Sequence, residues 1–415
     1  MPWHNRSKMS LKLEFVMLAD QEEANMSALC RRFDISRKTG YKWLNRYREE
    51  GRDGLSERSR RPNQSPNRTS DRVETAVCEV RKKHPAWGGR KIRARLQQQV
   101  ENKELPFGPD KIPAPSTCQS IVKRNGLLDS KNETRHTPYQ RFEKKAPNRL
   151  WQMDFKGHFP LTDGEQRCHP LTIIDDHSRF SLALTACADE QRETVKQRLT
   201  AVFRRYGLPR RILCDNGLPW GVPAAEQAGR PLYTKLNAWL FRLGIDVVHG
   251  RPYHPETQGK AERFHRSLDE EVLNQGSYQA LPECQTDFDQ WRKTYNLKRP
   301  HEAFSTEAGQ MEVPAHHYQP SGRPFPETLP EVSYPASNQV RLVSTRGQIR
   351  FAGSQFYIGE AFANHPVALR RKEPDDLEKA SLEHAALSAE RSAPEWEVYF
   401  CHKKVRVIES EIPDR

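Results

Sequence analysis

The sequence lacks several features that would assign it to a familiar class of protein. None of its 8 cysteines belongs to a C-x-x-C pair, which argues against a disulfide framework and against a tetrahedral zinc module. No hydrophobic run approaches the length of a membrane span, and the N-terminal residues lack the apolar core of a signal peptide. No Ser/His or Cys/His nucleophile pair stands out. We therefore expect a cytoplasmic protein with reduced cysteines and no membrane partner.

Positive charge is plentiful but unevenly distributed. The 415 residues are 35% hydrophobic and 29% charged with a mean hydropathy of -0.89, which is polar but globular, and the length suits about two to four domains. Residues 1–150 hold 33 Lys and Arg against 18 Asp and Glu, whereas the remainder holds 34 against 36. The whole net charge of +13 therefore comes from the first third, which favours a nucleic-acid-binding segment over a generic solvated basic domain.

Residues 1–55 have the pattern of a helix-turn-helix module. Leu11, Phe15 and Leu18 are spaced like one buried helix face, Ser27 and Ser36 are candidate N-caps for a short and a longer helix, and Gly51 follows the last helix. A short helix, a tight turn and a longer helix are typical of DNA-binding modules of this kind.

The longer helix has one apolar and one basic face. Its apolar face, which we expect to pack inward, consists of Gly40, Trp43, Leu44 and Tyr47. The opposite face carries the candidate DNA contacts Arg37, Lys38, Tyr41, Lys42 and Asn45. Cations suit phosphates, and flat or amide side chains suit base edges in the major groove. The plainer alternative is a small helical bundle with a solvated basic face.

Two linkers and a second helical module follow. Residues 56–70 form a polar linker whose Arg60 and Arg61 could follow a DNA backbone or minor groove. Residues 71–130 show three further helical segments, with a stripe of Val73, Val77 and Val80 and an N-cap candidate at Ser116, which predict a second helix-turn-helix-like domain. Residues 131–148 form a charged linker.

The pattern then changes to strands. In residues 149–310, strand-like runs come first and then alternate with helices, which predicts a mixed α/β domain. After a proline-rich linker at 318–330, six alternating runs between 334 and 408 predict a small antiparallel β-barrel, interrupted by an acidic, alanine-rich insertion at 372–394.

Three carboxylates carry the candidate chemistry. Asp154 lies in the apolar strand "WQMDF", Asp215 ends "RILCDNG", and Glu262 lies on the following helix. Such oxygen ligands suit Mg²⁺ or Mn²⁺, and two ions about 4 Å apart can assist an in-line phosphoryl transfer. The alternative is ordinary, because the chain has 54 acidic residues, strand-end Asp residues often cap turns, and helical Glu residues are usually solvated.

Four sequence blocks decide between these possibilities. "WQMDF", "TIIDDHSRF", "LCDNG" and "GRPYHPETQGKAERFHRSL" together resemble the catalytic core of DDE transposases from bacterial insertion sequences, whose core is similar to that of retroviral integrases. The resemblance covers about residues 150–310 and, with the helical front and β tail, nearly the whole chain. It implies an RNase H-like fold with a mixed five-stranded sheet, and it implies that Asp154, Asp215 and Glu262 bind two Mg²⁺ or Mn²⁺ ions.

The resemblance also implies an activity and partners. We expect a bacterial, nucleoid-associated DNA transposase that binds the terminal inverted repeats of an insertion sequence, cleaves the 3' end and transfers that strand into target DNA. Double-stranded DNA is then the partner, a homo-oligomer forms on it, and no nucleotide cofactor is needed. The alternatives are a catalytically inactive, transposase-derived DNA-binding regulator and a nuclease that hydrolyses without strand transfer.

Several features depart from the family pattern. The interval between Asp215 and Glu262 is long, which predicts an enlarged loop over the site, and position 269 holds Asp where relatives often carry a basic residue. Further candidate DNA contacts on the Glu262 helix are Lys260, Arg263 and, most favoured, Arg266. By analogy with the family, Asp175 and Asp176 close a turn rather than bind metal, while His254 could position DNA or have a structural role. No His-His-Cys-Cys zinc module precedes the core.

Overall fold

The computed structural model describes residues 8–58, 68–128, 143–162, 164, 166–221, 233–250, 259–305, 310–372 and 394–410. Contacts divide the chain into two units, Met1–Arg68 and Thr69–Arg415, which we describe separately. Within the described residues, no helix is both long enough and apolar enough to cross a bilayer.

The first unit is a helix-turn-helix, as predicted. It consists of α1 (Lys8–Ala19), α2 (Met26–Arg32), α3 (Arg37–Glu50) and a 3-10 turn (Gly51–Leu55). The Ser36 hydroxyl caps α3 by accepting from the amide of Thr39 at 3.2 Å. The prediction of Ser27 as the cap of α2 was wrong, because Asn25 accepts from the amide of Ala28 and starts that helix two residues earlier.

The small core of this unit lies under α3. Its buried members are Phe15, Val16, Ala19, Cys30, Trp43, Leu44 and Leu55. Leu11, expected in the core, is 40% exposed, since Val16 and Ala19 complete the buried face of α1 in its place. Gly40 allows the close approach of α3, because a Cβ there would lie 2.7 Å from Cys30 Sγ and 2.9 Å from Phe15 Cζ.

The second unit begins with three helices around a separate core. These are α4 (Asp71–Lys83), α5 (Gly89–Glu101) and α6 (Pro115–Arg124). The expected stripe of Val73, Val77 and Val80 is buried. Ser116 lies inside α6 rather than at its cap, because the helix starts with Pro115 and is preceded by Ala114. The turn between α4 and α5 contains the fully buried Trp87, whose ring stacks on His84 at 3.9 Å.

A mixed sheet forms the centre of the unit. Five strands run in the order β4-β3-β1-β5-β6, and the short β2 pairs with the start of β3. In the described residues this sheet therefore has six strands, one more than the five predicted. Strand β1 pairs antiparallel with β3 and parallel with β5, and β5 pairs parallel with β6. The strands are β1 (Trp151–Phe155), β2 (Phe159–Pro160), β3 (Arg167–Asp175), β4 (Ser181–Cys187), β5 (Arg211–Cys214) and β6 (Asp246–His249).

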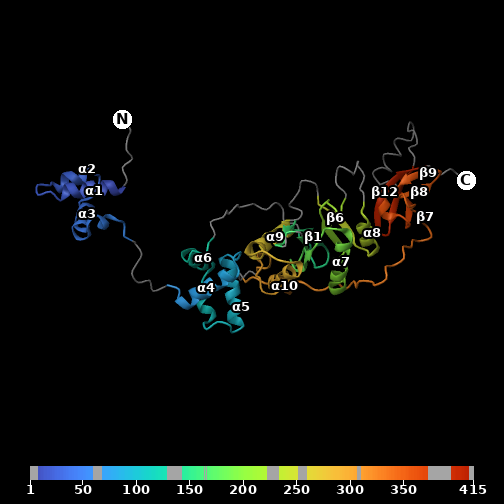
Figure 1. Cartoon of the computed structure of the whole chain (residues 1–415), viewed down its shortest axis with the longest axis horizontal. Coiled ribbons are helices and arrows are strands. Elements are labelled where there is room, and N and C mark those ends of the chain that lie inside the picture. Colours follow the sequence, from blue (N-terminus) through green and yellow to red (C-terminus); the bar gives the residue numbers. More distant parts are fainter. Residues whose placement is uncertain are drawn as a thin grey trace, which may run out of the picture. The chain divides into compact units, whose positions relative to one another are not determined.

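Four helices accompany this sheet. They are α7 (Arg192–Tyr206), α8 (Lys235–Arg242), α9 (Gly259–Glu271) and α10 (Leu281–Leu297). Helices α9 and α10 are both labelled in Figure 1. They pack together through Phe264, whose ring lies edge-on to Trp291 with the ring centroids 5.2 Å apart. At the end of α9, Glu271 accepts from the indoles of Trp291 at 2.8 Å and Trp87 at 3.1 Å and pairs with Arg299.

The last part of the chain is an antiparallel β structure. All six predicted strands form, but they divide into a four-stranded sheet of order β12-β11-β10-β7 and a separate hairpin β8-β9, so the described residues do not show the closed barrel that we predicted. The strands are β7 (Gln339–Leu342), β8 (Gln348–Phe351), β9 (Ser354–Tyr357), β10 (Pro366–Arg371), β11 (Glu395–Phe400) and β12 (Lys403–Glu409).

The proline-rich segment before these strands is packed onto the core. The amide of Leu208 donates to the carbonyl of Arg323 at 2.7 Å, and the Phe325 ring packs on Phe203. The Arg323 guanidinium in turn donates to the carbonyls of Pro209 and Leu243. This segment is therefore anchored at the start of β5 rather than suspended as a free linker.

Candidate active site

The sheet brings two of the candidate carboxylates to the same level. Asp154 is the fourth residue of β1, and Asp215 directly follows β5. In the parallel ladder Gln152 faces Leu213, and continuing this register by two residues sets Asp154 opposite Asp215. Since neighbouring strands lie about 4.8 Å apart and facing residues point to the same side, these two carboxylates share one region at the end of the strands.

The electrostatics of Asp154 show that the carboxylates affect one another. The pKa of Asp154 is raised to about 7, first by burial and then by the negative charge of Asp215, with smaller contributions in the same direction from Glu190 and Glu262. A hydrogen bond from the Phe155 amide opposes this effect. Such mutual repulsion is relieved when a cation binds, so the electrostatics suit a cation site.

Asp215 is held by the turn that follows it. Its Oδ1 accepts from the amide of Gly217 at 3.0 Å and from the indole N–H of Trp220. The Trp220 ring is 2% exposed and stacks on Phe155, the residue after Asp154, at 5.2 Å. The turn thus packs over the ends of β1 and β5, where the sequence predicted an enlarged loop, although residues 222–232 of that loop lie outside the described ranges.

Glu262 lies in the first turn of α9 and is exposed. Ala261, Phe264 and Leu268 form the buried face of that helix and leave the Glu262 side chain on the outer face. Within the ranges that the structure describes, no three acidic, His or Cys side chains come close enough to hold one ion. Asp215 and Glu262 therefore both lie within electrostatic reach of Asp154, but the three do not form a closed set of ligands. His254 and the rest of 251–258, just before α9, lie outside the described residues.

His265, which the sequence reasoning missed, supports Asp154 from α9. The Thr172 hydroxyl donates to the backbone oxygen of Asp154 at 2.9 Å, so it must accept from His265 Nε2 at 2.8 Å. Burial lowers the pKa of His265 to about 4, with a smaller effect from the charge of Lys156, and the ring is therefore neutral at pH 7. Its unprotonated Nδ1 lies 4.0 Å from Asp154 Oδ2, which is a contact rather than an ion pair.

The cations around α9 have different environments. Lys260, one of the predicted DNA contacts, forms an ion pair at 2.5 Å with the fully buried Asp176. Arg263 is exposed and lies 3.2 Å from Glu302, and Arg266 is exposed. The unexpected acid Asp269 pairs at 3.2 Å with Lys156, the residue that directly follows β1.

Of the remaining predicted DNA contacts, those on α3 share one surface. Arg37, Lys38, Tyr41, Lys42 and Asn45 are all exposed, opposite the buried Gly40, Trp43 and Leu44. Arg60 and Arg61 lie outside the described residues.

Asp175 closes the turn after β3, as expected, whereas the Asp176 side chain points to Gln152 and Lys260 outside the turn. Asp175 accepts from the amide and hydroxyl of Ser178 at 2.8 and 2.7 Å and from the amide of Asn148 at 2.7 Å. Its carboxylate is fully buried. Both oxygens of Asp175 are thus engaged within the turn, which leaves them poorly suited as metal ligands.

The donor set fits a hard divalent cation in its chemistry. Asp154, Asp215 and Glu262 offer carboxylate oxygens, which Mg²⁺ and Mn²⁺ prefer. Burial raises the pKa of Asp154 most, and the part of the rise that comes from neighbouring carboxylates reflects negative charge that a cation would neutralise. Burial raises the thiol pKa of Cys78, Cys118, Cys214 and Cys401. A reactive cysteine needs a lowered thiol pKa, so none of these four has the environment of a reactive thiolate.

Comparison with protein families finds four matches. Two integrase core domain families match residues 144–255 and 243–307, a helix-turn-helix domain family matches residues 11–63, and a homeodomain-like family matches residues 39–105. The two integrase matches together include β1, β5 and α9, and therefore all three candidate carboxylates.

Similar proteins come from insertion elements and retroviruses. A 39.2 kDa protein of insertion element IS476 from Xanthomonas euvesicatoria is 29% identical over 159 residues, which are 37% of this chain and 41% of that protein. A 31.7 kDa protein of insertion element IS407 from Burkholderia multivorans is 25% identical over 39% of this chain and 53% of that protein. The Gag-Pro-Pol polyprotein of Mason-Pfizer monkey virus is 35% identical over 29% of this chain and 6% of the polyprotein. The chain thus spans about half or less of the length of these relatives.

Similar solved structures are retroviral. The magnesium complex of the HTLV-2 integrase catalytic core domain has a TM-score of 0.29 and 17% identity, and covers 42% of this chain and 99% of that one. An intasome of simian T-cell lymphotropic virus with a PP2A regulatory subunit has a TM-score of 0.32 and 16% identity, over 68% of this chain and 94% of that one. Taken with the family matches, the sequence similarity shows that the chain contains an integrase core domain behind an N-terminal helix-turn-helix region and is distantly homologous to insertion-element proteins and retroviral integrases.

Proposed function

We propose that the protein is a DNA transposase that binds the terminal inverted repeats of an insertion sequence, cleaves the 3' ends and joins them to target DNA. The observation that carries the proposal is the pairing of Asp154 and Asp215 at the ends of adjacent parallel strands, with Glu262 in electrostatic reach. The integrase core matches and the insertion-element relatives support the same reaction class.

The carboxylates would hold two divalent cations, Mg²⁺ or Mn²⁺. Bound there, the cations would activate the attacking oxygen and stabilise the leaving oxygen of an in-line displacement at phosphorus. The protein's own part is to hold the ligands, and His265 supports Asp154 through Thr172, whose hydroxyl donates to the backbone oxygen of Asp154. Because the His265 ring is neutral, it adds no positive charge that would oppose a cation.

The reaction then consists of two displacements on the same scaffold. In the first, water attacks the phosphodiester at the end of the element, and the DNA strand leaves with a free 3'-OH. In the second, that hydroxyl attacks a phosphodiester of target DNA, forms the new P–O bond and releases the 3' oxygen of the target strand. No bond to the protein forms, so no side chain has to act as a nucleophile.

DNA binding is assigned to the first unit and to the exposed face of α9. The α3 surface of Arg37, Lys38, Tyr41, Lys42 and Asn45 has the chemistry of a recognition helix. Arg263 and Arg266 are exposed beside Glu262 and would contact phosphates near the reacting strand. Because two element ends must be held at once, the active form is a homo-oligomer on double-stranded DNA.

The experiment that tests this proposal uses the inverted repeats from the DNA around the gene as labelled duplexes. We expect Asp154→Asn to bind the repeat normally but to lose cleavage and joining in Mg²⁺, because the amide cannot replace the charged ligand. The control is Asp289→Asn on the exposed side of α10, which should keep full activity. Full activity of Asp154→Asn would refute the site.

Two other outcomes identify the rival functions. Hydrolysis of the ends without joining to a target plasmid would identify a nuclease. Repeat binding by the unaltered protein, with neither reaction in Mg²⁺ or Mn²⁺, would identify a transposase-derived regulator.

A further inference from the structure

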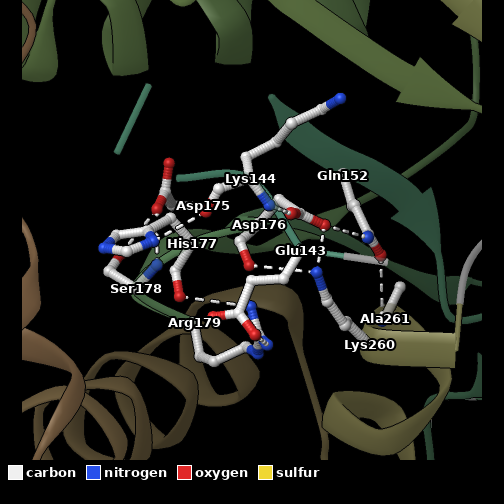
Figure 2. Close-up of polar contacts among 10 residues, drawn as sticks. All are labelled: Glu143, Lys144, Gln152, Asp175, Asp176, His177, Ser178, Arg179, Lys260 and Ala261. Carbon is white, nitrogen blue, oxygen red and sulfur yellow. Dashed lines mark hydrogen bonds and ion pairs between the residues drawn. The ribbon is translucent and has the colours of Figure 1, made fainter. Parts of the chain in front are cut away.

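A buried carboxylate lies at the centre of a polar network that joins β1, the turn after β3 and α9 (Figure 2). Asp176, in the turn after β3, is fully buried. Its Oδ1 accepts from Gln152 Nε2 at 2.9 Å and Lys260 Nζ at 2.5 Å, while Oδ2 accepts from the amide of Lys144 at 2.8 Å. The Lys260 ammonium also donates to the backbone oxygen of Asp176 at 3.2 Å. One side chain therefore joins β1, the β3–β4 turn and α9.

Gln152 makes a second connection to α9. Its Oε1 accepts from the amide of Ala261 at 3.3 Å, while its Nε2 donates to Asp176. Ala261 lies in the first turn of α9, where backbone N–H groups have no partner inside the helix. A side chain from the sheet thus satisfies one of these groups, and at 2% exposure Gln152 has little freedom to move away.

The positions of these residues in the sequence link the network to the candidate ligands. Gln152 and Asp154 are two residues apart on β1, so their side chains leave the same face of the strand. Lys260 and Ala261 directly precede Glu262. The contacts therefore connect the strand that carries Asp154 to the helical turn that carries Glu262. Gln152, Lys260 and Ala261 are only one or two positions away from Asp154 or Glu262 in the sequence.

We propose that Gln152, Asp176 and Lys260 are positioning residues that fix the first turn of α9 against β1 and thereby set the place of Glu262 relative to Asp154. The inference rests on the proposed function, because it assumes that Asp154 and Glu262 bind a common cation. The network does not include Asp215, whose position follows from the β1–β5 ladder and from Trp220. Lys260 then acts within the protein rather than on DNA.

Because Lys260 is positively charged, the effect of removing it on cation affinity distinguishes a positioning role from a purely electrostatic one. Removing a positive charge near a cation site strengthens cation binding if the charge acts only through space. If Lys260 positions Glu262, its removal weakens binding instead. Substitution of residues that orient metal ligands typically reduces metal affinity about 10- to 100-fold.

The test is Mn²⁺ binding to the full chain without DNA, followed by electron paramagnetic resonance of the free ion. Lys260→Met and Gln152→Met should each lose about tenfold in the Mn²⁺ affinity that depends on Glu262. Lys260→Arg should retain that affinity, because the guanidinium can still reach Asp176. The control is Lys293→Met, which removes a positive charge from an exposed position of α10 and should not weaken binding.

Combination with Glu262→Gln gives the decisive comparison. In that background Lys260→Met should cause no further loss, because a positioning residue has nothing left to position. Unchanged or stronger Mn²⁺ binding by Lys260→Met alone would overturn the inference, and so would a further loss in the Glu262→Gln background. Circular dichroism establishes that each variant is folded, and Lys260→Met decides the matter alone if Gln152→Met does not fold.

Failure of the proposed function itself has a different signature. If Asp154→Asn and Glu262→Gln bind Mn²⁺ as well as the unaltered protein, the assignment of the carboxylates as ligands is wrong, and the positioning role falls with it. If those two variants lose binding while Lys260→Met and Gln152→Met do not, the metal site stands and only the positioning role is refuted.

Discussion

The ion pair at the end of α9 supports a quantitative prediction about stability. Glu271 and Arg299 are each 4% exposed, and the Arg299 guanidinium also donates to the Ser267 hydroxyl at 2.8 Å. The isosteric change Glu271→Gln removes the negative charge without opening a cavity. It leaves the Arg299 cation buried without a counter-charge, which typically costs about 3–5 kcal/mol.

The two indoles at this position add to the cost. Trp291 and Trp87 donate to different oxygens of Glu271, at 2.8 and 3.1 Å, and a glutamine amide offers only one oxygen. One indole N–H is then left facing an amide NH₂ group, and a lost buried hydrogen bond costs about 1 kcal/mol more. We therefore expect Glu271→Gln to lower the free energy of unfolding of the second unit by about 4–6 kcal/mol.

The assay is urea unfolding of the full chain, followed by tryptophan fluorescence and by circular dichroism. Because the chain has two units, the transition of the second unit is fitted separately. Glu270→Gln is the matched control, since it makes the same chemical change at an exposed position of the same helix and should fall within about 0.5 kcal/mol of the unaltered protein. A difference below about 1 kcal/mol between the two variants would show that the pair is not a buried, mutually dependent contact.

Three further predictions concern the helical parts of the chain. Gly40→Ala should destabilise the first unit by about 1–3 kcal/mol, because the new methyl group would overlap Cys30 and Phe15; an unchanged unfolding midpoint would contradict this packing. Repeat binding should weaken steeply with salt, and Lys38→Ala should lower the slope of log K against log[salt] by about 0.9 if this lysine contacts a phosphate; an identical slope would exclude that contact. Burial lowers the pKa of His84 to about 4, so the folded protein resists protonation of this ring. Stability should be complete above the unfolded pKa of about 6.5 and fall by up to about 3 kcal/mol as the pH drops to 4, and His84→Gln should remove this component from urea titrations.

The sequence was most informative where local pattern and local structure coincide. Asp154 and Asp215 could be assigned to strand ends because apolar runs flank them and a glycine follows the second. The surface of α3 could be predicted because Gly40, Trp43 and Leu44 recur at the helical period. Such signals depend only on neighbouring residues.

Features that depend on distant partners could not be predicted in the same way. Lys260 looks like any cation in a basic stretch, and only the fold shows that Asp176, 84 residues earlier, lies within 2.5 Å of it. Gln152 and Trp220 have no sequence signal of their own, because their role depends on strand register and on the path of a turn. The same reason applies to the C-terminal strands, since their number is a local property while closure into a barrel requires a long-range pairing.

Strand β1 has a consequence for how the carboxylate arrangement could change. Strand β1, which carries Asp154, is connected to both of the other candidate ligands. Its ladder with β5 sets the distance from Asp154 to Asp215, and the hydrogen bond between Gln152 and the start of α9 sets the distance from Asp154 to Glu262. A displacement of β1 along its axis would alter both distances together, whereas a displacement of β5 or of α9 would alter only one. Substitutions in the five residues of β1, Trp151–Phe155, are therefore expected to change the distances from Asp154 to both Asp215 and Glu262. Substitutions in β5 or in α9 are expected to change only one of these two distances.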